Sequence, residues 1–355
     1  MNFRNRALTR VGAGFVGLAA AGAFASPVLA DEVTDVAVEA VGGSIGHYVG
    51  EKPAIFHLIN NSGRDLEDVE FTVDLSGLDD RITLDSISSI EDVNLACEGD
   101  ENGGVCSVDV LPRTARIALD FWLVPGDPES ILEPGDYGEI RVTVNHPDDE
   151  KTDNNSATLP VKIVAKLGAD LSVVALDVDT KVVDYDEDAF PVFGGPLHPG
   201  EEGALLYSIS NFGNFPVLNG VEITVELPLG VTFSYAEDEC EYSDDKRKAV
   251  CTYKDLVMVP YDWREDEDPE YPYGYTFWHY VTVYADVEAP VTLGDGVVTA
   301  VALEPDFEPE VNVLKAEAEP KLPENVVPLG EKGQEWFGEI DPSDNTDKFR
   351  VIVAG

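Results

Sequence analysis

The sequence predicts an all-β protein: two tandem Ig-like antiparallel β-sandwiches that follow an N-terminal signal peptide. Two observations support this fold class. Apolar and polar residues alternate nearly everywhere after Ala30, which is the period of a half-buried strand. Gly- and Pro-rich stretches such as "EPGDYG" and "GGPLHPGEEG" interrupt these runs at short intervals, and short strands separated by turns are typical of a sandwich.

Residues 1–30 have the features of a bacterial secretory signal. Arg4, Arg6 and Arg10 precede a short apolar run, and no acidic residue occurs before Asp31. Small residues up to Ala30 provide a cleavage site. We expect a secreted chain of about 325 residues without a membrane span. The alternative is an uncleaved N-terminal anchor.

The chain is strongly acidic. Its formal net charge is −46, and the loss of three leader arginines makes it −49. Such a charge keeps a protein soluble and repels nucleic acid and anionic lipid. We therefore expect a monomer that binds no nucleic acid. Hydrophobic residues make up 44% of the chain, enough to form packed cores.

The four cysteines are expected to form two disulfides, because an even count in an exported chain favours pairing. Local pairing would join Cys97 to Cys106 and Cys240 to Cys251, which places one bridge in each half of the chain. The alternative, a zinc site, would call for closely spaced CxxC pairs. The sequence contains none.

The two halves of the chain repeat one series of segments. "TDVAVEAV", "AIFHLINNSG" and "VEFTVDLSGL" in the first half correspond to "ADLSVVALDV", "ALLYSISNFG" and "VEITVELPLG" in the second. A cysteine pair follows in each half, and we match "YGEIRVTVNHP" to "YTFWHYVTVYADVEAP". The repeat predicts sandwiches at residues 31–166 and 167–355, with a long insertion at about 304–337 in the second.

Both halves end alike, with "TDNNSA" and "DPSDNT" before the last strand. Asp153 to Ser156 and Asp344 to Thr346 are expected to hydrogen-bond their own backbone as Asx-type turns. These segments would then be structural punctuation that starts the final strand of each sandwich.

These motifs resemble a known group of domains. The chain is similar to Ig-like repeats of bacterial surface and secreted proteins that are classified as a domain of unknown function, and to the related cell-adhesion module. The matching features are Asn211-Phe212-Gly213 after a strand, "VEITVELPLGVTF", the pair Cys240 and Cys251, "YVTVYADVEAP" and "DPSDNT". The resemblance implies an extracellular scaffold or adhesive role and no catalytic residues.

The motifs of the common hydrolases give no support for an enzyme. HExxH does not occur, and carboxylates are too abundant for any pair to be informative. G-x-S-x-G matches once, as "GGSIG" from Gly42 to Gly46, but the sequence predicts no helix after it, and a nucleophile elbow needs a strand–turn–helix context. His279 lies between aromatic residues in "FWHYVTV", where we expect it to pack on a strand. We therefore predict that the protein is not an enzyme; a hydrolase is the third alternative.

One acidic segment could bind calcium. Asp184, Asp186 and Asp188 have the spacing that opens an EF-hand loop, but Ala189 and Gly195 stand where the loop needs its Gly and Glu. A looser calcium site remains as an alternative to a solvated loop. The candidate ligands are Asp177, Asp179, Asp184, Asp186 and Asp188.

A Pro- and acid-rich loop of the second half provides a candidate contact patch. Its aromatic residues are Tyr261, Trp263, Tyr271 and Tyr273, and exposed aromatic rings bind sugars and proteins. The leading hypothesis is a secreted non-catalytic spacer, adhesive or matrix-type module. Its partner would be an extracellular protein or cell-wall carbohydrate, and it needs no cofactor. The second hypothesis is a calcium- or carbohydrate-binding module.

Overall fold

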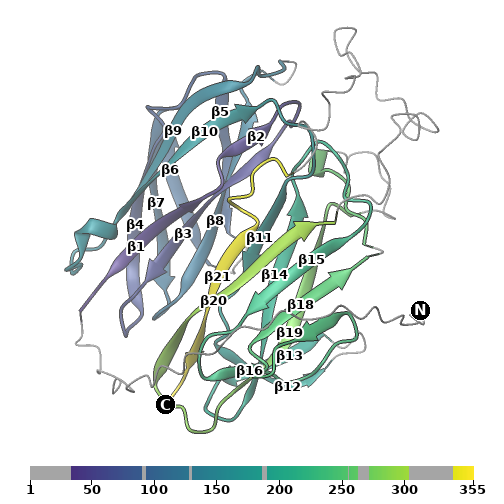
Figure 1. The fold of residues 1–355 in the computed structure, drawn as a ribbon. Coiled ribbons are helices and arrows are strands. Elements are labelled where there is room, and N and C mark those ends of the chain that lie inside the picture. The colour runs from purple at the N-terminus through teal and green to yellow at the C-terminus, as the bar shows by residue number, and fades with distance from the viewer. Residues whose placement is uncertain are drawn as a thin grey trace, which may run out of the picture. The chain divides into compact units, whose positions relative to one another are not determined.

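Strands make up nearly all regular structure in the computed structural model (Figure 1). The structure describes residues 33–89, 93–127, 130–185, 190–254, 256–262, 272–303 and 339–355. Within these ranges 3-10 turns occur at η1, Thr152–Asn154, and at residues 261–262, and no helix is long and apolar enough to cross a membrane. The predicted signal peptide and the insertion at about 304–337 lie outside the described residues.

The first half of the described chain forms two sheets that face each other. One sheet has the order β1-β3-β8-β5 and the other β2-β10-β9-β4-β7-β6. The strands are β1 (Val36–Val41), β2 (Ser44–Gly46), β3 (Lys52–Asn60), β4 (Leu66–Asp74), β5 (Ile82–Ser89), β6 (Leu95–Asp100), β7 (Gly103–Leu111), β8 (Arg116–Pro125), β9 (Gly135–Asn145) and β10 (Ser156–Val164). Figure 1 draws them in purple to teal.

The second half repeats this arrangement. One sheet has the order β13-β12-β14-β19-β16, with β11 also paired to β14, and the other has the order β17-β18-β15-β20-β21. The strands are β11 (Leu171–Ala175), β12 (Thr180–Tyr185), β13 (Pro191–Pro196), β14 (Glu202–Asn211), β15 (Val221–Glu226), β16 (Val231–Phe233), β17 (Cys240–Tyr242), β18 (Lys248–Tyr253), β19 (Gly274–Val283), β20 (Val291–Ala302) and β21 (Thr346–Val353).

The predicted fold class, all-β with two β-sandwiches, is confirmed by these four sheets. The order β6-β7-β4-β9-β10 of the first sandwich recurs as β17-β18-β15-β20-β21, and β1-β3-β8-β5 recurs as β11-β14-β19-β16. One predicted correspondence is wrong. The equivalent of β9 is β20, and β19 is instead the equivalent of β8, because β19 pairs with β14 as β8 pairs with β3.

Two asparagines occupy equivalent positions in the two sandwiches and form the same hydrogen bonds. In each sandwich an asparagine ends the central strand and is fully buried: Asn60 on β3 and Asn211 on β14. Each accepts a hydrogen bond on Oδ1 from the N–H two residues later, and each donates from Nδ2 to the carbonyl four residues later. A buried amide satisfied in this way fixes the turn that follows the strand.

The repeated endings also contain equivalent asparagines. Asn155 Nδ2 donates to the Val144 carbonyl, and Asn345 Nδ2 donates to the Ala300 carbonyl. The N–H of each of these strand residues donates back to the carbonyl of its asparagine, at 2.8 and 2.9 Å. The side chains therefore fasten the final strand to its neighbour, and the predicted Asx turns are wrong at these positions. A turn of that kind occurs instead at Asp341, which accepts the Ser343 N–H.

Both predicted disulfides are present. Cys97 bonds to Cys106 and Cys240 bonds to Cys251. Each pair lies directly opposite across a hairpin, β6–β7 in the first sandwich and β17–β18 in the second. The bridges thus close equivalent edge hairpins.

Each sandwich has its own hydrophobic core. One core is built from residues between Val36 and Ile163, and the other from residues between Leu171 and Val353. The cores separate close to the predicted boundary at about residue 166, although Glu32–Gly355 form one compact unit. The domain limits therefore stay predictions.

Candidate functional site

The candidate site is the contact between the two sandwiches. All nine residues of β3 are buried. Its inner face belongs to the first core. On its outer face, Ile55 packs with Ala118 of β8 and Val174 of β11 in a small apolar cluster between the sandwiches. Charged groups surround this cluster on both sides, and they distinguish the contact from an ordinary hydrophobic interface.

The Lys52 cluster consists of Lys52, Asp170, Asp341 and Asp344. Lys52 Nζ lies 2.7 Å from Asp170 Oδ2 and 2.9 Å from Asp344 Oδ2, and 3.9 Å from Asp341 Oδ2. The side chains of Lys52, Asp170 and Asp344 are no more than 1% exposed. Lys52 starts β3 in the first sandwich, whereas its three carboxylates belong to the second. This is a buried ion cluster across the contact.

One ammonium cannot neutralise three carboxylates, and their protonation reflects this. Burial raises the pKa of Asp344 to about 7, assisted by Asp170 and Asp341 and opposed by Lys52. Burial likewise raises the pKa of Asp170 to about 6. Burial alone would lower the pKa of Lys52, but the nearby carboxylates outweigh it and keep this ammonium charged.

Glu339 extends the same acidic environment. It accepts the Leu171 N–H at 2.8 Å through Oε1, and burial raises its pKa to about 7. Its backbone carbonyl accepts a hydrogen bond from Lys166 Nζ. Glu339, in the segment that precedes the final strand β21, is therefore bonded to Lys166 and Leu171 near the boundary between the sandwiches.

The Arg116 cluster lies across the same contact. Arg116 Nη1 donates to Asp347 Oδ1 at 2.6 Å, and Arg116 Nη2 donates to His57 Nδ1 at 2.9 Å. Burial would raise the pKa of Asp347, but His57 and Arg116 outweigh burial and hold it at about 2. Burial and the Arg116 charge lower the pKa of His57. Asp347 of the second sandwich is thus ionised and is held by two side chains of the first sandwich, Arg116 and His57.

Asp177 is a structural residue of this contact. Its Oδ1 accepts the Arg350 N–H at 2.7 Å and its Oδ2 accepts the Arg116 N–H at 3.0 Å. Arg350 in turn donates to the Thr114 carbonyl and to Asn61 of the first sandwich. Both Asp177 carboxylate oxygens are occupied by backbone donors, which assigns this predicted calcium ligand to the contact between the sandwiches.

The remaining calcium candidates are not brought together by the described structure. Asp184 lies on β12 and Asp179 just before it, while Asp186 and Asp188 lie outside the described residues. Among described residues, no group of three or more His, Cys, Asp or Glu could hold a metal ion. The calcium site stays a prediction.

The predicted aromatic contact patch is only partly exposed. Tyr261 is 8% exposed, and its ring stacks on Trp122 of the first sandwich at 5.0 Å between centroids. Tyr261 therefore belongs to the contact between the sandwiches and is no free surface residue. Tyr273 is 38% exposed and packs edge-on against Tyr261. Trp263 and Tyr271 lie outside the described residues.

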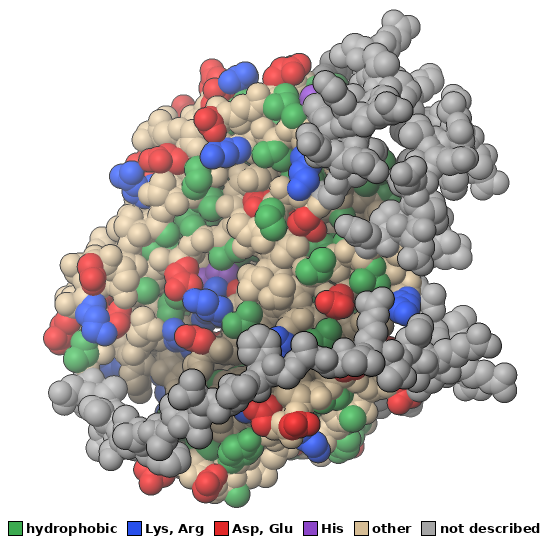
Figure 2. Space-filling model, in the orientation of Figure 1, with side chains coloured by type: hydrophobic (Ala, Val, Ile, Leu, Met, Phe, Trp, Pro, Cys, Tyr) green, Lys and Arg blue, Asp and Glu red, His purple; other side chains and the backbone are tan. Residues whose placement is uncertain are grey.

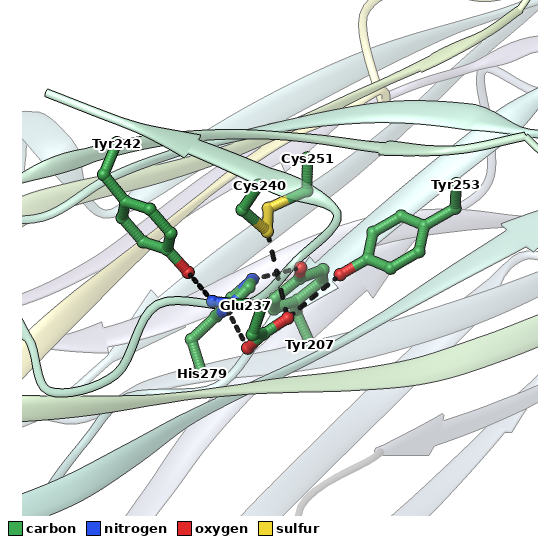
Figure 3. Close-up of a disulfide and its surroundings, with 7 residues drawn as sticks. All are labelled: Tyr207, Glu237, Cys240, Tyr242, Cys251, Tyr253 and His279. Carbon is green, nitrogen blue, oxygen red and sulfur yellow. Dashed lines mark hydrogen bonds and ion pairs between the residues drawn. A yellow bond between two sulfur atoms is a disulfide. The ribbon is translucent and has the colours of Figure 1, made fainter. Parts of the chain in front are cut away.

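A polar network fills the space beside the second disulfide (Figure 3). His279 Nδ1 lies 2.9 Å from Glu237 Oε1, and His279 Nε2 lies 2.9 Å from the Tyr207 hydroxyl. Tyr253 donates to Glu237 Oε2, and the Glu237 N–H donates to the Tyr242 hydroxyl. Tyr207 and His279 are each 1% exposed. Although the order Glu–His–Tyr resembles a proton relay, the hydroxyl at its end is closed to a substrate.

In the first sandwich, two phenylalanines occupy the positions equivalent to Tyr207 and His279. The strand pairings make Phe56 the equivalent of Tyr207 and Phe121 the equivalent of His279. Phe56 and Phe121 pack with ring centroids 4.7 Å apart. The network is therefore a polar variant of an aromatic core pair, and His279 packs on a strand as the sequence predicts.

The acidic residues do not converge on one place of the visible surface. Figure 2 shows Asp and Glu side chains spread over the face drawn, with Lys and Arg side chains between them. Such a distribution indicates a general solubilising charge on that face.

Comparisons with known proteins assign no family. No protein-family model and no curated protein matches the chain. Among solved structures, a variant of BcpA, the major pilin subunit of Bacillus cereus, matches with a TM-score of 0.27 and 9% identity, over 75% of this chain and 59% of that one. The BSP domain of a biofilm associated protein matches with a TM-score of 0.23 and 9% identity, over 80% and 58%.

A third match is the secreted serine protease VesC from Vibrio cholerae, with a TM-score of 0.18 and 12% identity, over 71% of this chain and 48% of that one. The chain spans less than two thirds of each of these structures. The similarity to pilin and biofilm-associated proteins is distant.

Proposed function

We propose that the chain is a secreted, non-catalytic structural protein that acts outside the bacterial cell as a spacer, adhesive or matrix-type module. The observation that carries this proposal is the buried ionic contact between the sandwiches. Lys52 and Arg116 of the first sandwich each reach a buried carboxylate of the second. Such contacts hold two domains in one orientation, because separating them would leave charges without partners.

The two disulfides support an exterior location, since disulfides persist in oxidising compartments. Each closes an edge hairpin of its sandwich. The leader-like first thirty residues point the same way. A module of this kind would resist unfolding at the cell surface and would present its loops at fixed positions.

The non-catalytic part of the proposal rests on the His279 network. A nucleophile must be reached by its substrate and positioned by a base. Tyr207 and His279 are core residues at 1% exposure, and their equivalents in the first sandwich are two phenylalanines. The network thus has a packing role.

The test is fractionation of the producing cell followed by affinity capture from its envelope. The full-length chain with a C-terminal tag should appear in the medium or cell-wall fraction and should retain an envelope protein or glycan. The same chain reduced and unfolded is the matched control for non-specific capture. Recovery from the cytoplasm alone would contradict the proposal.

The calcium-binding alternative has a separate test. Millimolar calcium should raise the melting temperature above that in a chelator if Asp184 and its neighbours bind the ion. Magnesium at the same concentration controls for ionic strength. An equal effect of both ions, or none, would remove calcium from the account.

A further inference from the structure

The first sandwich contains a cavity that its core leaves unfilled. It has a volume of about 370 Å³ and lies beside the Cys97–Cys106 disulfide. Strand β5 lines one side and the β6–β7 hairpin the other, so the cavity opens between the two sheets of the sandwich. Its apolar lining includes Leu75, Leu78, Ile82, Leu84 and Ile87. A volume of this size suits a small ligand.

In the second sandwich, aromatic side chains occupy the place equivalent to this cavity. Strand pairing makes Phe233 the equivalent of Leu84, and Tyr242 the equivalent of Gly99. The rings of Phe233 and Tyr242 pack edge to face with centroids 5.2 Å apart. In the first sandwich both equivalent residues line the cavity. The cavity thus occurs in the first sandwich at a place that aromatic rings occupy in the second, and the fold alone does not produce it.

Backbone contacts keep this wall of the cavity bare. Gly99 lies opposite Gly104 across the hairpin. A Cβ added to Gly99 would lie 2.4 Å from the Gly103 carbonyl oxygen, and one added to Gly104 would lie 2.4 Å from the Glu98 carbonyl oxygen. No side chain of the hairpin can therefore fill the cavity from these two positions.

The rim of the cavity is acidic. Five carboxylate residues line it together with the apolar residues, and no Lys or Arg is among its described lining residues: the acids are Asp79, Asp80, Glu98, Asp100 and Glu101. The neighbouring Arg81 forms hydrogen bonds to both carboxylate oxygens of Asp79 and also lies near Asp80, so the anionic part of the rim is Glu98, Asp100 and Glu101. An apolar interior with an anionic rim complements an apolar molecule that carries a positive charge.

We propose that this cavity binds a small amphiphilic cation, an alkyl- or aryl-ammonium compound. Its apolar part enters between Leu78, Leu84 and Ile87, and its ammonium group stays at the rim near Glu98 and Glu101. Burial of the apolar part provides the affinity, and the carboxylates select for charge.

The test uses n-octylammonium chloride as the probe and the mature chain in its oxidised form. Isothermal titration calorimetry should show saturable binding at one site, and methyl NMR should show shifts at Leu84 and Ile87. Octanoate has a similar tail and the opposite charge, and it should bind at least tenfold more weakly. Equal binding of the two probes, or binding that does not saturate, would overturn the proposal.

Two variants locate the site. Leu84→Phe introduces the residue of the second sandwich, and it should weaken octylammonium binding about tenfold, the loss expected if roughly two methylene groups are no longer buried. Glu98→Gln combined with Glu101→Gln should reduce the preference for octylammonium over octanoate. Glu70→Gln, an exposed residue of β4 outside the cavity, is the matched control and should bind as the native chain does.

If Leu84→Phe does not fold, the double variant Glu98→Gln, Glu101→Gln tests the proposal by itself. Because Glu98 lies on the exposed strand β6, its replacement should leave the melting temperature unchanged within a few degrees. Native-like selectivity in that double variant would overturn the proposal, as would native-like affinity in a folded Leu84→Phe protein.

Discussion

Lys52 Nζ lies 2.7 Å from Asp170 Oδ2, and the two side chains belong to different sandwiches and are closed to solvent. The equivalent of Asp170 in the first sandwich is Asp35, which pairs with Lys151 of its own sandwich at 2.8 Å. Lys151 is 58% exposed, and the position equivalent to it in the second sandwich is Asp341. A local ion pair in the first copy thus corresponds to a pair between domains in the second.

The comparison predicts very different effects for two lysine substitutions. Lys52→Ala should lower the free energy of unfolding by about 3–5 kcal/mol, because it leaves buried carboxylates unpaired. Lys151→Ala should lower it far less, since the Lys151 ammonium is exposed to solvent and Asp35 still accepts a hydrogen bond from the Asn154 amide. Urea unfolding of both variants measures this difference. Equal effects would show that the buried cluster has no special role.

The raised pKa values predict that stability falls with pH. Asp344 has its pKa raised from 3.8 to about 7 on folding, so the folded state binds more protons between these values. Its contribution is therefore most favourable below pH 4 and is lost as pH rises through 7, at about 1.4 kcal/mol per pKa unit. Asp170 at about 6 and Glu339 at about 7 act in the same direction.

The difference between native and Asp344→Asn proteins isolates this effect, because the lowered pKa of His57 acts in the opposite direction in both. Melting temperatures between pH 5 and pH 8 should fall more steeply in the native protein. Parallel curves for the two proteins would contradict the assignment. Asp74→Asn, at a half-buried carboxylate of β4 in the first sandwich, serves as the control.

The His279 network predicts strong coupling between two core substitutions. Tyr207→Phe and His279→Phe should each cost about 1–3 kcal/mol, because each leaves a buried polar group without its partner. The double variant recreates the Phe56–Phe121 pair of the first sandwich and should cost less than the sum of the two. A double-mutant cycle on unfolding free energies measures this coupling. Additive effects would show that the hydrogen bond is unimportant for stability.

The acidic charge predicts that salt stabilises the fold. A chain of net charge −46 repels itself when compact, and 1 M salt shortens the Debye length to about 3 Å. The melting temperature should therefore rise between 0.05 and 1 M NaCl, on the order of several degrees. A fall over this range would show that attraction between opposite charges, which salt also screens, outweighs the repulsion among the carboxylates.

Local patterns were sufficient to predict the all-β fold class, the main alternating strands, both disulfides and the repeat. Alternation of apolar residues specifies one buried face, as on β4 and β15. It cannot reveal that β3 is covered on its second face, because the covering residues come from the other sandwich. The mismatch of β9 with β19 has a similar cause: both segments alternate, and only the pairing of β19 with β14 identifies its true equivalent.

The contact residues were missed because their partners are distant in the sequence. Lys52 and Asp170 are separated by 118 positions, and nothing near either one indicates an ion pair. One signal was available. Lys52 opens a largely apolar strand in a chain with only 23 Lys and Arg residues, and a cation at such a place suggests a buried partner. Tyr261 was predicted to be exposed because its neighbours in the sequence are polar and its cover, Trp122, is far away in the chain.

The central claim is that the two sandwiches form one unit. Differential scanning calorimetry of the mature, oxidised chain at pH 6 tests it most directly. The account predicts that both sandwiches unfold in a single transition, whose calorimetric enthalpy equals its van't Hoff enthalpy. Two resolved transitions, each with half the enthalpy and neither shifted by Lys52→Ala, would contradict it.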